Sequence, residues 1–241
     1  MSGTWSSVGA MQATRDRAIE LLTGIAGPGA QLRDDQWTAI DALVNDRRRM
    51  LVVQRTGWGK SAVYFIAAKL LRDSGAGASL IISPLLALMR NQVAAARRAG
   101  IRAATLNSAN MTEWEEVQEQ VAAGEVDVLL ISPERLNNPG FRDEVLPALA
   151  ATVGMVVVDE AHCISDWGHD FRPDYRRIST LLEGLPAGVP VLATTATANE
   201  RVSLDVAEQL GGDVLTLRGG LDRESLHLAV APISGTSSQL A

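Results

Sequence analysis

Two short segments of this chain carry residues that together could hydrolyse a nucleoside triphosphate. The first is a glycine-rich stretch that follows an apolar, strand-like run at residues 51–53. Glycines let backbone N–H groups turn toward phosphates, and a helix that begins here would add its positive end. Lys60 can balance the charge of the β and γ phosphates, and the Ser61 hydroxyl can ligate Mg²⁺. The stretch therefore predicts a phosphate-binding loop made of Thr56, Gly57, Trp58, Gly59, Lys60 and Ser61.

Two positions depart from the usual phosphate loop. The full pattern begins with a glycine at position 54, where this chain has Gln54. Trp58 lies between the two glycines of the loop, at a position that is normally small. Its ring could lie over the loop without a role in the chemistry, or it could contribute to function. The sequence leaves both interpretations of Trp58 open.

The second segment is the acidic pair Asp159 and Glu160, which directly follows the apolar run Met155-Val156-Val157-Val158. Such a run is typical of a buried parallel strand, and open α/β sheets bind ligands at the carboxyl ends of their strands. On an extended chain the two carboxylates would point apart. Asp159 could then hold Mg²⁺ with Ser61, while Glu160 orients the attacking water. His162 would, by itself, be a structural histidine.

The composition limits the class of protein further. The chain has 241 residues, of which 46% are hydrophobic, enough for one large α/β domain with a sizeable core. The single cysteine, Cys163, excludes an internal disulfide and a multi-cysteine zinc site, and it fits a reducing cytoplasm. No stretch is typical of a signal peptide or long enough to span a bilayer, so we expect no membrane partner. The net charge of −6 does not by itself indicate binding to nucleic acid.

Apolar strand-like runs alternate with helical patterns along the chain. We expect strands at residues 51–54, 79–83, 104–106, 126–132, 155–159, 190–195 and 214–217, and helices at 8–25, 60–72, 85–99, 113–123, 174–183 and 200–210. Because the strands are apolar throughout, they predict an α/β fold with a doubly wound, mostly parallel sheet and helices on both faces. We expect an N-terminal helical extension at 1–30, one domain at 31–230, and a polar linker at 231–241.

From about residue 32 to residue 230, the sequence resembles the RecQ-type DNA helicases of superfamily 2, whose ATPase domains are RecA-like P-loop folds. Residues 159–162 are similar to their DEAH box, which implies a catalytic set of Lys60, Asp159, Glu160 and His162, with ATP and Mg²⁺ as cofactors. ATPases of the helicase type also relax the glycine at position 54. Residues 32–36 are similar to the adenine-recognition motif, which implies that Arg33 and Gln36 contact the base. The aromatic residue that the family usually has shortly upstream is absent between residues 27 and 32.

Further segments resemble the DNA-contacting and coupling motifs of the family. The resemblance implies such roles for Ser83, Pro84, Ser132, Pro133, Arg135, Thr195 and Thr197. Residues 165–175 are similar to the aromatic-rich loop of the family, which adds Trp167, His169, Phe171 and Arg172. The rings of this loop could stack on DNA bases and so shift Glu160 or His162. They could also form a hydrophobic cluster packed under the sheet.

The resemblance implies the ATP-binding motor half of a 3′–5′ DNA helicase that acts in DNA repair and recombination. ATP hydrolysis would drive translocation along single-stranded DNA and the unwinding of duplex junctions in a full-length protein. A second RecA-like domain would follow there, and this domain alone would hydrolyse little ATP. We expect it in the cytoplasm, at the nucleoid in a bacterium, without zinc in this segment. Two alternatives stay open: an RNA-dependent helicase or remodeller of the same superfamily, and a nucleotide-dependent nucleic-acid-binding module with little turnover.

Overall fold

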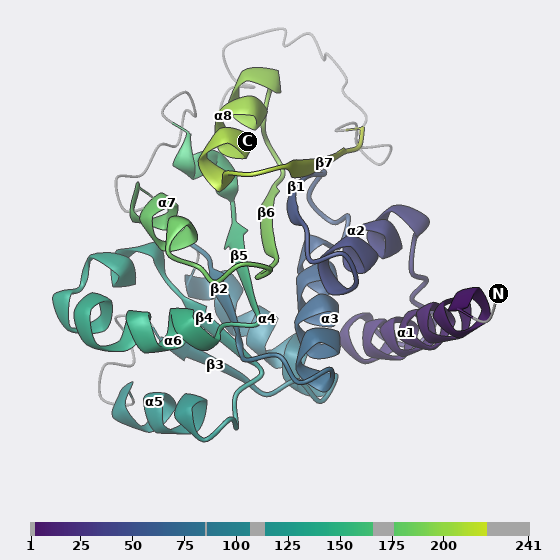
Figure 1. Ribbon diagram of the computed structural model, residues 1–241, viewed down its shortest axis with the longest axis horizontal. Coiled ribbons are helices and arrows are strands. Elements are labelled where there is room, and N and C mark those ends of the chain that lie inside the picture. Colours follow the sequence, from purple (N-terminus) through teal and green to yellow (C-terminus); the bar gives the residue numbers. More distant parts are fainter. Residues whose placement is uncertain (1–2, 85, 107–113, 166–175, 221–241) are drawn as a thin grey trace, which may run out of the picture.

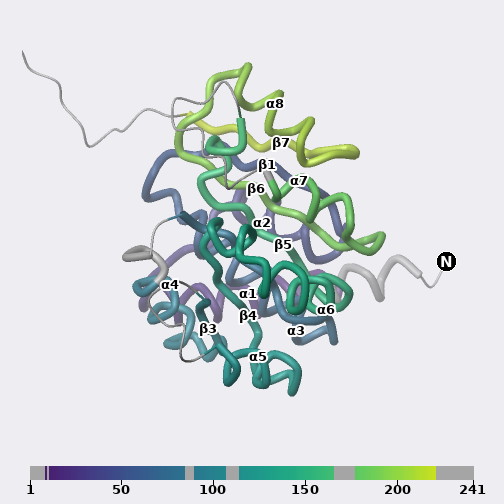
Figure 2. Tube along the Cα trace, turned by 90° about the vertical axis from the view of Figure 1, so that its left-hand side faces the viewer, coloured from purple at the N-terminus to yellow at the C-terminus, as the bar shows by residue number. Residues whose placement is uncertain are grey.

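The fold is built on one parallel sheet. A computed structural model describes residues 3–84, 86–106, 114–165 and 176–220. In these residues seven strands pair side by side in the order β3-β4-β2-β5-β6-β1-β7, and every pair is parallel. In Figure 2 the labelled strands follow this order from top to bottom, from β7 through β1, β6, β5 and β4 to β3. The strands are β1 Arg49–Val53, β2 Ser79–Ile82, β3 Ala103–Leu106, β4 Val128–Ile131, β5 Met155–Asp159, β6 Val191–Thr195 and β7 Val214–Arg218.

Helices cover both faces of the sheet, because alternate residues of each buried strand point to opposite sides. In β1, Met50 and Val52 join one buried cluster, whereas Leu51 and Val53 join the other. Figure 1 shows α1, α2 and α3 on one side of the sheet and α6 and α7 on the other. The first face is packed by α1 Gly3–Ala26, α2 Asp34–Val44, α3 Lys60–Asp73 and α4 Leu86–Arg98. The second is packed by α5 Trp114–Ala122, α6 Leu146–Thr152, α7 Arg176–Glu183 and α8 Glu200–Leu210.

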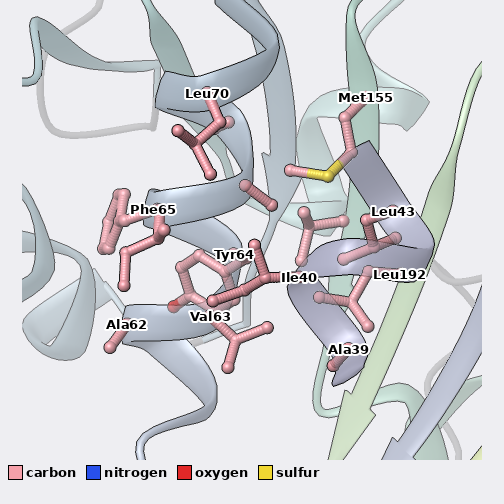
Figure 3. Close-up of a cluster of buried hydrophobic side chains, with 14 of the residues drawn as sticks. Ala39, Ile40, Leu43, Ala62, Val63, Tyr64, Phe65, Leu70, Met155 and Leu192 are labelled. Atoms are coloured by element: carbon pink, nitrogen blue, oxygen red, sulfur yellow. The ribbon is translucent and has the colours of Figure 1, made fainter. Parts of the chain in front are cut away.

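Helix α3 lies in the middle of the first face and is almost entirely buried. Figure 3 shows Tyr64 of α3 next to Ile40 of α2, with Met155 and Leu192 of the sheet nearby. All four of these side chains are fully buried. A helix held on this many sides is a rigid support, so the residues at its first turn are fixed relative to the sheet.

The predicted α/β fold with a parallel sheet and helices on both faces is confirmed. All seven expected strands are present, with ends that differ by a few residues. The expected first helix at 8–25 is the longer α1, which buries Ala18, Leu21 and Leu22 in the same cluster as α3. Within the described ranges, no helix is both long and apolar enough to cross a bilayer. The domain boundaries at residues 30 and 231 stay predictions.

Two α-helices were not expected from the sequence. Helix α2 begins inside the predicted adenine motif, and α6 is short and carries Pro147 in its first turn. In the part of the chain that the structure describes, three short helical turns join the larger elements: η2 Pro133–Asn137, η3 Phe141–Val145 and η4 Ala161–Ile164. Two of these turns, η2 and η4, begin after one intervening residue beyond strands β4 and β5, so they lie at the carboxyl edge of the sheet.

Candidate nucleotide-binding and catalytic site

The glycine-rich segment forms the connection from β1 to α3. Gly57 and Gly59 have φ angles of 84° and 97°, in the left-handed region that side chains rarely adopt. Gly59 is also the N-cap of α3, so the helix begins at Lys60. The first N–H groups of a helix have no partner inside the helix and favour an anion. Thr56 is exposed on the loop, and Ser61 is half-buried in the first turn of α3.

Lys60 folds back over the loop that precedes it. Its Nζ atom donates to the backbone oxygens of Gln54 at 2.7 Å and Arg55 at 3.4 Å. Burial lowers the pKa of Lys60, while the carboxylates of Glu160 and Asp159 act in the opposite direction. The cationic group is therefore held inside the loop and close to the acidic pair.

Trp58 is buried and joins the loop to the start of α2. Its indole Nε1 donates to Asp35 Oδ2 at 2.8 Å. Its backbone oxygen accepts from Arg33 Nη1 at 2.9 Å and from Gln36 Nε2 at 2.7 Å. These contacts tie the loop to α2, which fits the interpretation of Trp58 as a packing residue. A role of its ring in the chemistry stays an untested interpretation.

The amide of Gln36 is already engaged within the protein. Besides the Trp58 contact, Gln36 Oε1 accepts from the backbone nitrogen of Arg33 at 3.1 Å. The Gln36 amide also packs closely against Gly59: a Cβ atom added to Gly59 would lie only 2.6 Å from Gln36 Nε2. The structure thus brings Arg33 and Gln36 to the phosphate loop. Their contact with adenine stays a prediction, and it would require Gln36 to exchange one of these hydrogen bonds.

Asp159 ends β5 and is buried between the two neighbouring strands. Its Oδ1 accepts from Thr194 Oγ1 at 2.7 Å, and its Oδ2 accepts from Ser83 Oγ at 3.3 Å. Burial raises the pKa of Asp159, and the hydrogen bond from Thr194 opposes that effect. Two hydroxyl donors from β6 and from the end of β2 thereby fix the direction of this carboxylate.

Glu160 departs from the conformation that we expected. It has φ 52° and ψ 46°, so the chain leaves the strand here instead of staying extended. A residue other than glycine is uncommon in this region, and such outliers concentrate at functional sites. Its Oε2 atom lies 3.3 Å from His162 Nδ1, and its side chain is more exposed than that of His162. The left-handed residue turns the chain into η4, and the two carboxylates have different partners: Asp159 contacts Thr194 and Ser83, whereas Glu160 contacts His162.

His162 connects the acidic pair to β6. Its Nδ1 atom lies 2.9 Å from Thr195 Oγ1, and the Thr195 hydroxyl also accepts from the backbone nitrogen of Thr197 at 3.2 Å. The adjacent Cys163 sulfur and the Glu160 carboxylate raise the pKa of His162, against the effect of burial. The structure therefore joins Glu160, His162, Thr195 and Thr197 in one chain of contacts.

Comparison with known proteins decides what kind of site this is. The sequence profile of the DEAD/DEAH box helicases matches residues 33–205, which include the loop, the acidic pair and Thr194 to Thr197. The chain belongs to the DEAD/DEAH box helicase family. The expected resemblance to RecQ-type DNA helicases is also confirmed by the relatives below.

The relatives include bacterial RecQ helicases and a mouse helicase. The chain is 37% identical over 204 residues to the ATP-dependent DNA helicase RecQ of Bacillus subtilis, which covers 83% of this chain and 33% of that protein. It is 37% identical over 194 residues to the Haemophilus influenzae RecQ, with 80% and 30% coverage. The mouse bifunctional 3′-5′ exonuclease/ATP-dependent helicase WRN is 34% identical over 207 residues, with 85% and 14% coverage. The chain therefore spans a third or less of the length of these relatives.

Solved helicase structures share the fold. The DEAD-box helicase Mss116 superposes with a TM-score of 0.66 at 17% identity, over 84% of this chain and 42% of that one. The Hef helicase domain of Pyrococcus furiosus gives 0.59 at 19% identity, over 77% and 38%. At such identities the likeness concerns the fold, and it confirms the RecA-like architecture of this DEAD/DEAH domain.

Several of the residues expected to contact DNA are buried in the interior of the DEAD/DEAH domain. Ser83, Ser132 and Pro133 are buried, and Pro84 is half-buried. Arg135 is also buried, with its guanidinium 3.6 Å from the ring centroid of Trp114. Their part in DNA binding stays a prediction. Trp167, His169, Phe171 and Arg172 lie outside the described residues.

Two contacts at this site were missed from the sequence. Thr194 stands directly opposite Asp159 in the register of β5 and β6, so strand parity would place both on one face. That register cannot be read before the strands are paired. The Trp58–Asp35 hydrogen bond joins residues 23 positions apart, and no local pattern indicates it.

Proposed function

We propose that this chain is the ATP-binding motor half of a RecQ-like 3′–5′ DNA helicase. The observation that carries the proposal is the meeting of two groups at the carboxyl edge of the sheet. Lys60 of the phosphate loop lies near enough to the acidic pair for both carboxylates to act on its charge, and Glu160 of the pair connects through His162 to Thr195. A site of this form can couple a change at the phosphates to a neighbouring strand.

The residues present fit a nucleoside triphosphate with Mg²⁺. The loop offers backbone donors at Gly57 and Gly59, the first turn of α3, and the Lys60 cation. Ser61 and Asp159 are oxygen donors of the kind that Mg²⁺ prefers, and they would hold the metal. When bound, Mg²⁺ neutralises charge on the phosphate oxygens.

Glu160 is suited to orient and deprotonate the attacking water. It is the more exposed of the two carboxylates, and its Oε2 atom is paired with His162 rather than buried in the sheet. Asp159 has its carboxylate fixed by Thr194 and Ser83, which suits a metal ligand. We assign water activation to Glu160 on this difference in surroundings.

The relatives support DNA rather than RNA as the partner. The proteins from Bacillus subtilis and Haemophilus influenzae carry the name ATP-dependent DNA helicase RecQ. Direction of movement, unwinding of duplex junctions, repair and recombination are carried over from that resemblance. We also propose a second RecA-like domain as partner in the same protein, and work on DNA in the cytoplasm, at the nucleoid in a bacterium.

Titration with MgATP tests the phosphate-loop assignment. The chain has two lysines, Lys60 and Lys69, both on α3. Lys60→Ala should weaken MgATP binding by about 10- to 100-fold, the worth of a hydrogen bond from a charged group. Lys69→Ala is the matched control, because Lys69 pairs with Asp73 at the far end of the helix and should leave binding unchanged. Equal affinity of the Lys60→Ala variant and the parent would show that the loop does not bind phosphate.

A further inference from the structure

Gln54, which replaces the usual first glycine of the phosphate loop, is buried at a junction of three segments. Its backbone nitrogen donates to Thr195 O at 3.1 Å, and its backbone oxygen accepts from Lys60 Nζ at 2.7 Å. One residue therefore contacts both the lysine of the loop and the strand end that holds His162. Any displacement of the Gln54 backbone would therefore disturb both Lys60 and Thr195.

The third segment is the chain that leaves β7. A Cβ atom on Gly219 would come within 2.6 Å of Gln54 Cδ and closer still to its Oε1 and Nε2 atoms. The side-chain amide of Gln54 thus lies directly against Gly219, where it leaves no room for a methyl group. By contrast, a Cβ atom on the neighbouring Gly220 would meet nothing within 4 Å.

Gly219 is itself held in place. Its backbone nitrogen donates to Val53 O at 3.1 Å, which extends the pairing of β1 and β7 by one residue. Arg218 Nη2 donates to Ala198 O at 2.9 Å and to Ser203 Oγ at 2.6 Å. The end of β7 is therefore fastened to β1 and to the chain that follows β6.

We infer that Gln54 is a positioning residue for ATP binding, and that Gly219 is the fixed surface against which it packs. The usual phosphate loop has a glycine at position 54, where this chain has a larger side chain. The space that this side chain needs exists because the residue opposite it, at the end of the neighbouring strand β7, is Gly219. Gln54 fills the space, and its packed side chain holds the carbonyl that orients Lys60. Through this contact, a shift of the backbone at Gly219 would also move Gln54 and with it the phosphate loop. This inference rests on the proposed function, since it names a residue that positions the ATP-binding loop.

A double-mutant cycle on the 241-residue chain tests the inference, with MgATP affinity from calorimetric titration as readout and thermal melting alongside. Gly219→Ala should weaken MgATP binding by about tenfold, because the added methyl displaces Gln54 and with it the loop. Gly220→Ala is the matched control and should bind as the parent does. Gln54→Ala should weaken binding by about threefold, because the loop loses its packing.

The decisive variant combines both changes. Gln54→Ala with Gly219→Ala should bind MgATP as Gln54→Ala alone does, because the methyl then has room. A double variant as weak as Gly219→Ala alone would overturn the inference, and so would parental affinity in Gly219→Ala. If Gly219→Ala alone fails to fold, the double variant should fold and bind. A double variant that is also unfolded would overturn the inference.

The proposed function and this inference fail in different ways. If the parent chain does not bind MgATP, or binds it equally well as Lys60→Ala, the proposed function is wrong and the inference falls with it. If the parent binds and Lys60→Ala does not, but Gly219→Ala binds like the parent, the inference alone is wrong.

Discussion

At the scale of single residues, Asp159 and Glu160 are neighbours with different surroundings. Asp159 is enclosed by hydroxyl donors from two strands, whereas Glu160 lies in a left-handed conformation and contacts His162. Strain of this kind persists only where the surroundings hold it. The difference predicts that the two carboxylates fail in different ways when they are replaced.

Glu160→Gln should keep MgATP affinity but reduce the rate of ATP hydrolysis by ~10²–10⁴, because the amide cannot accept a proton from the attacking water. Asp159→Asn should instead weaken the Mg²⁺-dependent part of nucleotide affinity, because it removes charge from a metal ligand. Steady-state ATPase assays and titrations with and without Mg²⁺ separate the two. Parental rates in both variants would mean that the pair is not catalytic.

At the scale of elements, the phosphate loop is fastened to α2 through one residue. Trp58 is buried, donates to Asp35 and accepts from Arg33 and Gln36. The loop and the predicted adenine motif should therefore unfold together rather than separately. Stability measurements on Trp58 variants test this link between elements.

Trp58→Ala should lower the free energy of unfolding by ~3–5 kcal/mol, as truncation of a large buried aromatic does. Trp58→Phe keeps most of the ring and loses the hydrogen bond to Asp35, so it should cost ~0.5–1.5 kcal/mol. Urea unfolding of both variants gives the comparison. If Trp58→Ala costs no more than Trp58→Phe, the ring does not pack against α2 in solution.

At the scale of the whole molecule, the two ends of the sheet differ: one carries the candidate site, and the other carries a buried cluster of ion pairs. The carboxyl end carries the loop and the acidic pair, whereas the amino end is tied together by the fully buried Asp127. Arg102 Nη2 lies 2.6 Å and Arg72 Nε 3.4 Å from Asp127 Oδ1, and Lys69 Nζ is 3.9 Å from Oδ2. Burial raises the pKa of Asp127, but the hydrogen bonds from Arg102 and the charge of Lys69 outweigh it and hold the pKa below its ordinary value.

A lowered pKa in the folded state means that Asp127 stabilises the fold above its unfolded pKa of 3.8, and that this contribution is lost as the pH falls through the folded value. Asp127→Asn should therefore lower the free energy of unfolding at pH 7 by ~3–5 kcal/mol and flatten the loss of stability below about pH 4. Asp143→Asn is the control, because Arg142 lowers the pKa of Asp143 as well but the pair is exposed to solvent, so both effects should be far smaller. Denaturant unfolding from pH 7 to pH 2.5 gives both quantities. An unchanged pH profile in Asp127→Asn would contradict this account.

Turnover also belongs to this scale. In related phosphoryl-transfer systems an arginine finger from another domain is worth ~10³–10⁵ in rate, and we propose that a second RecA-like domain supplies it here. The 241-residue chain assayed alone should thus hydrolyse ATP slowly, with little stimulation by single-stranded DNA or by RNA. Rapid DNA-stimulated hydrolysis by this chain would refute the motor-half proposal, and stimulation by RNA alone would favour the RNA-dependent alternative.

Much of the fold could be predicted from the sequence because its signals are local. Short apolar, β-branched runs such as Met155–Val158 favour buried parallel strands. The loop from Thr56 to Ser61 and the pair Asp159 and Glu160 are contiguous, so their chemistry is legible without coordinates. Helix α2 was not predicted although Asp34 and Asp35 in its first turn favour the start of a helix, because residues 32–36 were interpreted only as a binding motif.

The class of the fold, the phosphate loop and the acidic pair can therefore be predicted from the amino-acid sequence. The side chains that meet across elements are known only from the folded chain: Thr194 with Asp159, Thr195 with His162, Asp35 with Trp58, and Gly219 with Gln54. The same is true of the left-handed conformation in which Glu160 leaves the strand. The physical reason is that these contacts depend on strand register and on helix packing, which join residues 23 to 165 positions apart (58 − 35 and 219 − 54) and leave no trace in any local pattern.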